Sequence, residues 1–105
     1  MNSSFVVYLV DILSCLGQVE ARRMFGSQGL YLNGIFFAIV SDDILYLKTN
    51  PRTVGKYQSY GALPFAPSEK QVLKNYLAVP VDILDDEELL IEWVKEAVSC
   101  CHPGI

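Results

Sequence analysis

The residues whose types could do chemistry are few, and one group lies close to the end of the chain. Cys100, Cys101 and His102 place two thiols beside the only imidazole of the sequence. Zinc sites use such ligands, but with cysteines two to four residues apart and a second ligand pair elsewhere. A histidine beside a chain end also lacks the packed frame that orients a catalytic imidazole. We therefore expect neither a metal site nor a catalytic site at this position.

Two short turns and one acidic cluster provide the other candidates. The turn Gly26-Ser27-Gln28-Gly29 resembles a phosphate cradle, but no Gly-Lys-Ser/Thr follows it and the next segment is predicted to be a strand. Asp42 and Asp43 supply fewer oxygens than the roughly six that a hard cation takes. The acidic residues at 85–88 fit a helix start better than a catalytic carboxylate pair. We predict no catalytic residues, no cofactor and no metal, and we expect that the chain is not an enzyme.

Arg22 and Arg23 form the most informative charged feature. Successive residues of a strand point to opposite faces, so one arginine approaches Tyr31 while the other remains in solvent. Two interpretations stay open: a contact to a partner or a phosphate, or one arginine that packs its stem on the sheet and one that is simply solvated. We name Arg22, Arg23, Tyr31 and Lys48 as possible partner-binding residues.

The composition predicts one globular domain over residues 1–105. The chain has 105 residues, 51% of them hydrophobic, which is enough for a core without disulfides. No apolar run reaches the roughly 18 residues that cross a bilayer, and the N-terminus lacks the pattern of a signal peptide. Three cysteines, two of them adjacent, do not make a disulfide framework. We expect a cytoplasmic protein with reduced thiols.

The charge of the chain is unevenly distributed. The formal net charge is −4; residues 20–75 hold seven basic residues against four acidic ones, and residues 76–105 hold seven acidic residues against Lys95 alone. A chain this acidic lacks the electrostatic footprint of an autonomous nucleic-acid-binding domain. We therefore expect no binding to duplex DNA by the chain alone.

Hydrophobic periodicity and turn residues predict the elements that must position these side chains. Asn33-Gly34 between apolar runs is a strong hairpin signal, and Asp42-Asp43 is a weaker one. Capping residues place helices near Asn50-Pro51 and after Asp85. The expected helices are 4–16, 51–60 and one that starts after Asp85; the expected strands are 19–25, 30–32, 36–41, 44–48, 63–65 and 72–79. The predicted fold is α+β, a two-layer antiparallel sheet with helices in the order α-β(3)-α-β(2)-α, and an extra strand before the Asn-Gly hairpin remains open.

Two-residue turns also predict the register of the strands. They pair Leu32 with Ile35 and Ser41 with Ile44, which sorts the side chains onto two nearly apolar faces. Helices in a two-layer domain cover one face, so the other should form an interface, and a twofold homodimer is the simplest occupant. The alternative is that residues 63–79 or a loop fold over that face. The predicted core face comprises Tyr31, Phe36, Ala38, Val40, Leu45 and Leu47; the predicted interface comprises Leu30, Leu32, Ile35, Phe37 and Ile39.

Several stretches together resemble the N-terminal domain of the TfoX/Sxy competence regulators. The most specific of them is Arg22-Arg23-Met24-Phe25-Gly26, followed by Gly29-Leu30-Tyr31 and Leu45-Tyr46-Leu47-Lys48. Ser27 departs from the pattern, because the family often has a second glycine there. Further matching residues, in the same order along the chain, are Gly34, Phe37-Ala38, Asp43, Gly61, Pro64-Phe65, Tyr76, Val79-Pro80, Leu84 and Trp93.

This resemblance implies a secretion-chaperone-like domain with a regulatory role. In the family, that role is to assist a cAMP-receptor-type activator at promoters of bacterial DNA-uptake genes. The two-domain members carry a second, helical domain, so we expect this chain to be either a stand-alone member or one half of a longer regulator. The expected partner is a protein, either such an activator or the second domain. Two alternatives from other classes remain: a small-ligand-binding domain around Arg22 and Arg23, and a chaperone-like scaffold that binds a peptide at a bare strand edge.

Overall fold

The computed structural model describes residues 4–24 and 26–101. Phe25 and His102, which figure in the predictions above, lie outside the described residues. The helices are α1 (Ser4–Leu13), the short 3-10 helix η1 (Ser14–Leu16), α2 (Val54–Ser59), α3 (Val81–Leu84) and α4 (Glu87–Cys101). The strands are β1 (Val19–Met24), β2 (Ser27–Leu32), β3 (Ile35–Ser41), β4 (Ile44–Lys48), β5 (Pro64–Ser68) and β6 (Gln71–Ala78).

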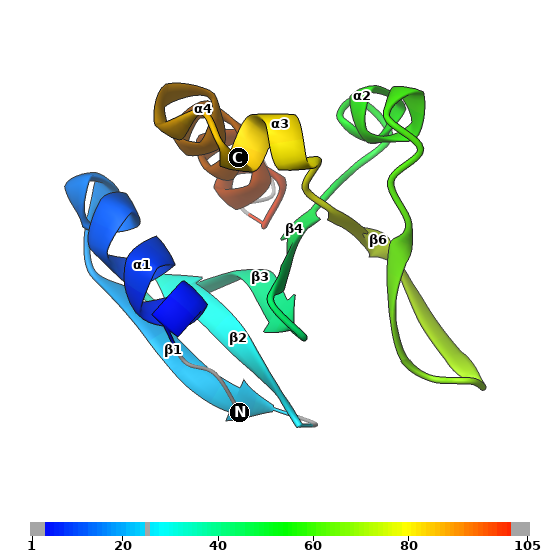
Figure 1. Ribbon diagram of the computed structural model, residues 1–105, viewed down its shortest axis with the longest axis horizontal. Coiled ribbons are helices and arrows are strands. Elements are labelled where there is room, and N and C mark those ends of the chain that lie inside the picture. The colour runs from blue at the N-terminus through cyan, green and yellow to red at the C-terminus, as the bar shows by residue number, and fades with distance from the viewer. Residues whose placement is uncertain (1–3, 25, 102–105) are drawn as a thin grey trace.

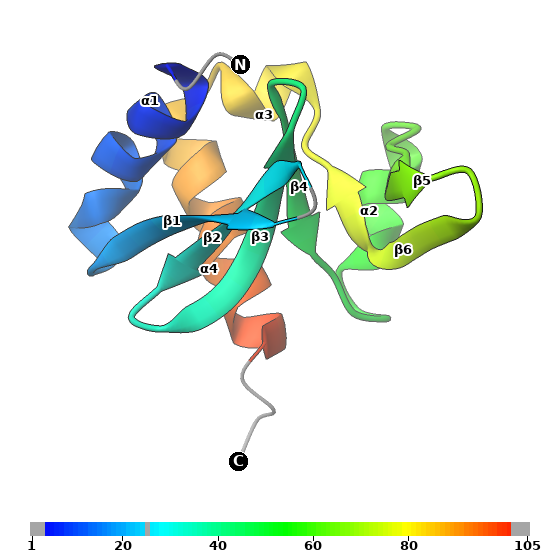
Figure 2. The ribbon, with the colours of Figure 1, turned by 90° about the horizontal axis from the view of Figure 1, so that it is seen from below.

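The strands form one antiparallel sheet in the order β1-β2-β3-β4-β6-β5. Figure 1 shows the strands as an arch, with β1 and β2 on one side and β6 on the other. Seen from below in Figure 2, the strands lie in front of α2, α3 and α4. The predicted α+β fold is thus confirmed, and β1 is the extra strand that the sequence left open.

The two predicted hairpins are present, with the predicted pairs Leu32–Ile35 and Ser41–Ile44. Asn33 and Gly34 have φ values of 50° and 84°, the left-handed geometry that a two-residue hairpin turn needs. The predicted turn at Gly26–Gly29 is wrong in extent, because Ser27 already pairs with Met24 and the strand β2 begins there.

A β-bulge in β3 changes the side on which several residues lie. Tyr31 pairs with Phe36, but the next residue back, Leu30, pairs with Ala38, which leaves Phe37 without a partner in β2. An extra residue of this kind reverses the alternation of side chains beyond it. Tyr31 and Phe36 therefore lie on one face of the sheet and Ala38 lies on the other. The predicted core face is wrong for these two aromatic residues.

The bulge also overturns the predicted exposed interface. Leu30, Leu32 and Phe37 belong to the core beneath the helices, with exposures of 0%, 7% and 0%. Ile39 lies on the helix-free face and is also fully buried, while Ile35 is half-buried. The five residues therefore do not form an exposed patch, and the homodimer predicted from them loses its structural basis.

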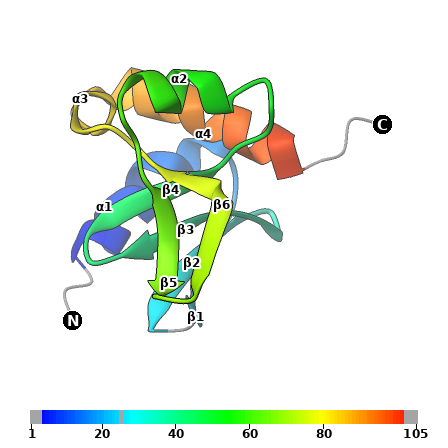
Figure 3. The same ribbon diagram turned by 90° about the vertical axis from the view of Figure 1, so that its right-hand side faces the viewer.

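The helix-free face is enclosed by the curl of the sheet toward β5 and β6. The ring of Tyr46 in β4 lies 5.0 Å from the ring of Phe65 in β5, although β6 runs between those strands. Figure 3 shows the β5–β6 hairpin extending down in front of β1 and β2, with α2, α3 and α4 above the strands. This is the alternative in which residues 63–79 fold over the face. β5 forms one edge of the sheet, a position that tolerates the missing backbone N–H of Pro64.

The helices start where capping residues satisfy their free backbone N–H groups, but not quite where predicted. The Asn50 side-chain oxygen accepts hydrogen bonds from the backbone N–H groups of Arg52 and Thr53, at 2.8 and 3.1 Å, yet α2 itself begins only at Val54. The last helix is capped by Asp86 and not by Asp85, because Asp86 Oδ1 accepts the N–H of Leu89 at 3.2 Å. The inner side of this helix faces the core: Leu90, Trp93, Val94 and Ala97 are buried, and Cys101 is half-buried.

Candidate functional site

A row of three aromatic rings crosses the helix-free face of the sheet and carries a cation at each end. The ring of Tyr31 lies 5.2 Å from that of Phe36, and the ring of Phe36 lies 5.6 Å from that of Tyr76. The Arg22 guanidinium lies 4.6 Å from the centre of the Tyr31 ring, and the Lys48 ammonium lies 5.2 Å from the centre of the Tyr76 ring. We call these five residues the aromatic ladder.

The ladder draws its members from five strands, four of them consecutive in the chain and the fifth, β6, more distant. Arg22 and Tyr31 come from the β1–β2 hairpin, Phe36 precedes the bulge of β3, and Lys48 pairs directly with Tyr76 across β4 and β6. The bulge is essential to this arrangement, because without it Tyr31 and Phe36 would lie on the side of the sheet that the helices cover. Cation–π contacts of this kind contribute about 0.5–1 kcal/mol each at exposed sites.

The ladder is anchored to the helical layer at the end of α4. The Cys101 thiol donates a hydrogen bond to the backbone carbonyl of Phe36 at 3.0 Å. Burial raises the pKa of this thiol, and the Lys48 ammonium opposes only part of that effect. A raised pKa keeps sulfur as the weakly reactive thiol, whereas nucleophilic and metal-binding cysteines are thiolates. The hydrogen bond from Cys101 thus ties the end of α4 to the backbone of Phe36.

The phenol of Tyr76 is the most perturbed group of the ladder. Burial, followed by the neighbouring Cys101 and Tyr31, raises the pKa of Tyr76 to about 12. The raised pKa keeps the phenol uncharged well into the alkaline range, where it remains a hydrogen-bond donor and acceptor. The ladder presents neutral polar groups and two cations on a rigid aromatic surface.

Three of the four predicted partner-binding residues meet in the ladder. Arg22, Tyr31 and Lys48 are brought together, whereas Arg23 points to the opposite side of β1 because strand side chains alternate. Arg22 is held by Glu20, whose carboxylate lies 3.2 Å from the guanidinium, and its side chain is still 61% exposed. Phe36 and Tyr76 are site residues that the sequence did not predict. Phe36 and Tyr76 belong to the ladder because of the bulge in β3 and the pairing of β4 with β6. Neither feature has a local signal in the sequence.

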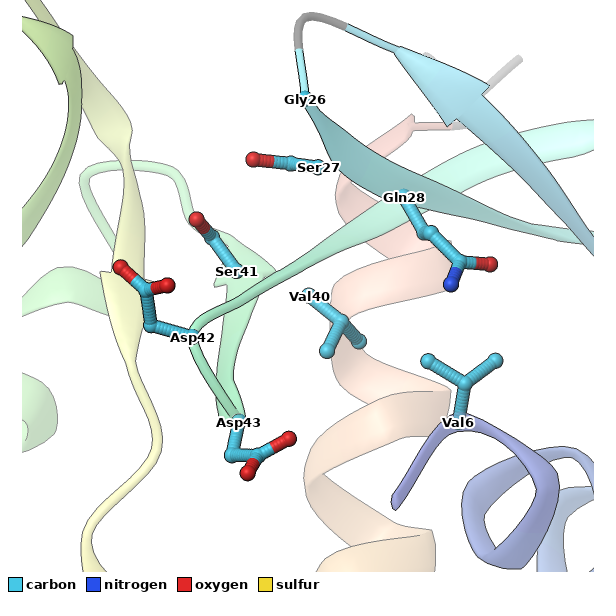
Figure 4. Close-up of a pocket in the computed structure, with 8 residues that line it drawn as sticks. All are labelled: Val6, Gly26, Ser27, Gln28, Val40, Ser41, Asp42 and Asp43. Carbon is cyan, nitrogen blue, oxygen red and sulfur yellow. The ribbon is translucent and has the colours of Figure 1, made fainter. Parts of the chain in front are cut away.

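The two turns that were considered as ligand sites lie next to each other in the fold. They line an open hollow of about 260 Å³, together with Val6 of α1 (Figure 4). Its described lining includes Asp42 and Asp43 and neither Lys nor Arg, so it does not attract phosphate. The two carboxylates point in different directions in Figure 4. Within residues 4–24 and 26–101, no three His, Cys, Asp or Glu side chains are grouped so as to hold a metal ion.

A helical layer on one face of a curled antiparallel sheet, with aromatic and cationic side chains on the other face, defines this molecule as a small α+β domain. The model of the TfoX N-terminal domain matches residues 11–101 of the chain. The chain therefore belongs to the TfoX N-terminal domain family, as its sequence indicated. No curated protein is similar enough to count as a relative. No helix within the described residues has the length and apolar character that crossing a lipid bilayer requires.

Proposed function

We propose that this chain is a non-enzymatic regulatory domain that binds a protein partner through the aromatic ladder. The observation that carries the proposal is the ladder itself, which places three aromatic rings and an exposed arginine on a face of the sheet without helices. Aromatic residues and arginine are the types that are enriched in protein interfaces and that dominate binding energy there.

The rigidity of the ladder favours such a role. Each ring contacts another ring, and each cation contacts a ring, so the side chains lose little conformational freedom when a partner covers them. Ordering a flexible side chain at an interface costs about 0.5–1.5 kcal/mol, and a surface that is already ordered avoids much of this cost. The contacts with the rings leave less ring surface free for stacking nucleic-acid bases, which favours a protein over a single-stranded nucleic acid.

The family supports the biological setting of the proposal. Regulation of competence is the role that the TfoX N-terminal domain family suggests. We propose that the partner is a cAMP-receptor-type transcription activator, and that binding occurs in the bacterial cytoplasm at promoters of DNA-uptake genes. A second, helical domain of a longer regulator is the other candidate partner for the same surface.

Binding between the purified chain and the cAMP-loaded activator from the same cells tests the proposal. Isothermal titration calorimetry should give a measurable affinity that Arg22→Ala and Tyr31→Ala each weaken about tenfold or more, as expected for residues at the centre of an interface. The matched controls are Arg23→Ala, on the other side of the same strand, and Tyr8→Ala, whose side chain is exposed on α1.

The controls decide between outcomes. Equal loss of affinity in Arg22→Ala and Arg23→Ala would mean that net charge and not the ladder drives binding. No binding to the activator, together with ladder-dependent binding to a separate helical domain, would keep the surface and change the partner. Unchanged affinity in both ladder variants would refute the proposal.

A further inference from the structure

A second surface, at the opposite end of β4 from the ladder, gathers four exposed apolar side chains around one groove. Leu63 is 73% exposed, Val81 68%, Tyr60 52% and Ile44 40%. They line a groove of about 360 Å³, which is within the size range of binding pockets of ~300–1,000 Å³. Single exposed apolar residues are ordinary, but a cluster around a concavity is typical of an interaction site.

The groove has a firm floor formed by short side chains. Gly61, Ala62, Ala78 and Pro80 line it and leave room between the larger residues. Its walls are tied to the sheet by backbone hydrogen bonds: the N–H of Ala78 donates to the Leu63 carbonyl at 3.0 Å, and the N–H of Val79 donates to the Leu45 carbonyl at 2.8 Å. The groove is thus a built feature of the fold and can receive a large apolar side chain.

The rim of the groove is acidic. Among the described residues that line it, Asp43 alone is charged, and Asp42 lies beside it in the same turn. Burial and the charge of Asp42 raise the pKa of Tyr46, which also lines the groove. Asp82 follows Val81 and is exposed. An apolar cavity with carboxylates around it favours an apolar group that is flanked by positive charges.

We propose that this groove binds a segment of a partner protein in which one large apolar side chain is flanked by Lys or Arg. The apolar side chain fills the space between Leu63, Val81 and Ile44, and the basic groups pair with the carboxylates of the rim. A second copy of this chain fits less well. A twofold contact at the groove would place the acidic rims of both copies against each other, and the chain already carries a net charge of −4.

The groove and the ladder share no described residue, although Tyr46 and Ala78 of the groove lie two strand positions from Lys48 and Tyr76. Ile44 and Lys48 stand at opposite ends of β4, and the four residue steps between them span roughly 13 Å. Leu63 and Val81 of the groove and Arg22 and Tyr31 of the ladder can therefore be changed separately. The failure of one proposal is thus distinguishable from the failure of the other.

Fluorescence anisotropy with labelled 12-residue peptides tests the inference on the full chain. The probes are a Leu/Lys peptide, a Leu/Glu peptide and a Ser/Lys peptide of equal length. We expect the Leu/Lys peptide alone to bind, with an affinity that falls as salt rises. Leu63→Ser and Val81→Ser should each weaken it about tenfold, and Val7→Ser, an equally exposed apolar residue on α1, should leave it unchanged.

The charge requirement has its own variant. Asp42 and Asp43 have φ values of 51° and 61°, and asparagine tolerates this backbone region, so the double change Asp42→Asn and Asp43→Asn keeps the turn. It should lower the affinity several-fold and flatten the dependence on salt, while Arg22→Ala should have no effect. Equal binding of the Leu/Glu peptide, insensitivity to Leu63→Ser, or a dimer that Leu63→Ser dissociates while no peptide binds would overturn the inference.

Discussion

Arg22 and Arg23 show how much the fold decides for chemically identical neighbours. Alternation along β1 sends Arg22 to the ring of Tyr31 and the carboxylate of Glu20, whereas Arg23 lies on the other side of the strand. From the sequence, both were possible partner-binding residues, and neither could be distinguished from a simply solvated arginine. The register of β1 on β2 selects Arg22 as the member of the site, because it pairs Glu20 with Tyr31 and Arg22 lies two residues beyond Glu20 on the same face.

Burial of Ile39 predicts that this side chain is structural and not part of an interface. Ile39→Asp should unfold the domain or lower its free energy of unfolding by at least about 3 kcal/mol, because aliphatic contacts are lost and a carboxylate is buried. Urea denaturation followed by circular dichroism measures the effect. The control is Ile44→Asp, at a side chain that is 40% exposed, which should cost less than about 1 kcal/mol. A folded Ile39→Asp variant that changes from dimer to monomer would restore the interface interpretation.

The raised pKa values of Tyr57 and Tyr76 predict that the free energy of unfolding falls in alkali. Burial raises the pKa of Tyr76 from about 10 in an unfolded chain to about 12, and it raises the pKa of Tyr57 as well. The folded state thus retains these protons after the unfolded state has lost them. The free energy of unfolding should therefore be unaffected below about pH 10 and fall as the pH rises from 10 to 12.

Urea unfolding at a series of pH values measures this dependence. Tyr76→Phe and Tyr57→Phe should each make the alkaline decline less steep, because phenylalanine has no proton to lose. Tyr8→Phe, at an exposed position of α1, is the control and should leave the slope as it is. A decline that none of these variants changes would show that other groups cause it.

At the scale of elements, the hydrogen bond at the start of α4 predicts different effects on stability for substitutions of the adjacent residues Asp85 and Asp86. Asp86→Ala removes the side chain that accepts the Leu89 N–H, and should cost about 1 kcal/mol of stability. Asp85→Ala is the matched control, and thermal unfolding should show a much smaller change for it. Equal losses in the two variants would mean that general charge at the helix N-terminus matters more than the hydrogen bond.

The elements that could be predicted are those whose signals are local. Asn33-Gly34 specified its turn because both residues must adopt positive φ, and the apolar spacing of residues 90–97 specified the inner face of α4. The bulge at Phe37 could not be predicted, because it depends on how β2 packs on β3 and no residue type demands it. One unpaired residue was enough to exchange the faces of Leu30, Leu32, Tyr31 and Phe36.

The missing parts of the site have a related cause. The ladder requires Tyr76 to reach β4, and the sequence offers no signal for the pairing of β4 with β6 across 27 or more intervening residues. The same pairing curls the sheet and buries Ile39. The fold class, the hairpins and the helical core face were thus accessible from the sequence, whereas the surfaces that result from the curl were not.

At the scale of the whole molecule, the charge distribution predicts no autonomous binding to duplex DNA. The net charge is −4, and the acidic last thirty residues include the whole of α4. Long-range repulsion should oppose the encounter with a polyanion. An anisotropy titration with duplex DNA at ~150 mM salt should show no appreciable binding. Sequence-specific binding tighter than about a micromolar would contradict the prediction.

The two ends of the sheet also bear on how the protein behaves at high concentration. β5 is the edge strand on one side, and prolines occupy two of its five positions, so it lacks the full row of N–H donors that an added strand requires. β1 is the edge strand on the other side and presents Glu20, Arg22 and Arg23 within six residues. Neither edge is a template for the stacking of further chains, so growth into fibrils by edge-to-edge addition is disfavoured at both ends of the sheet.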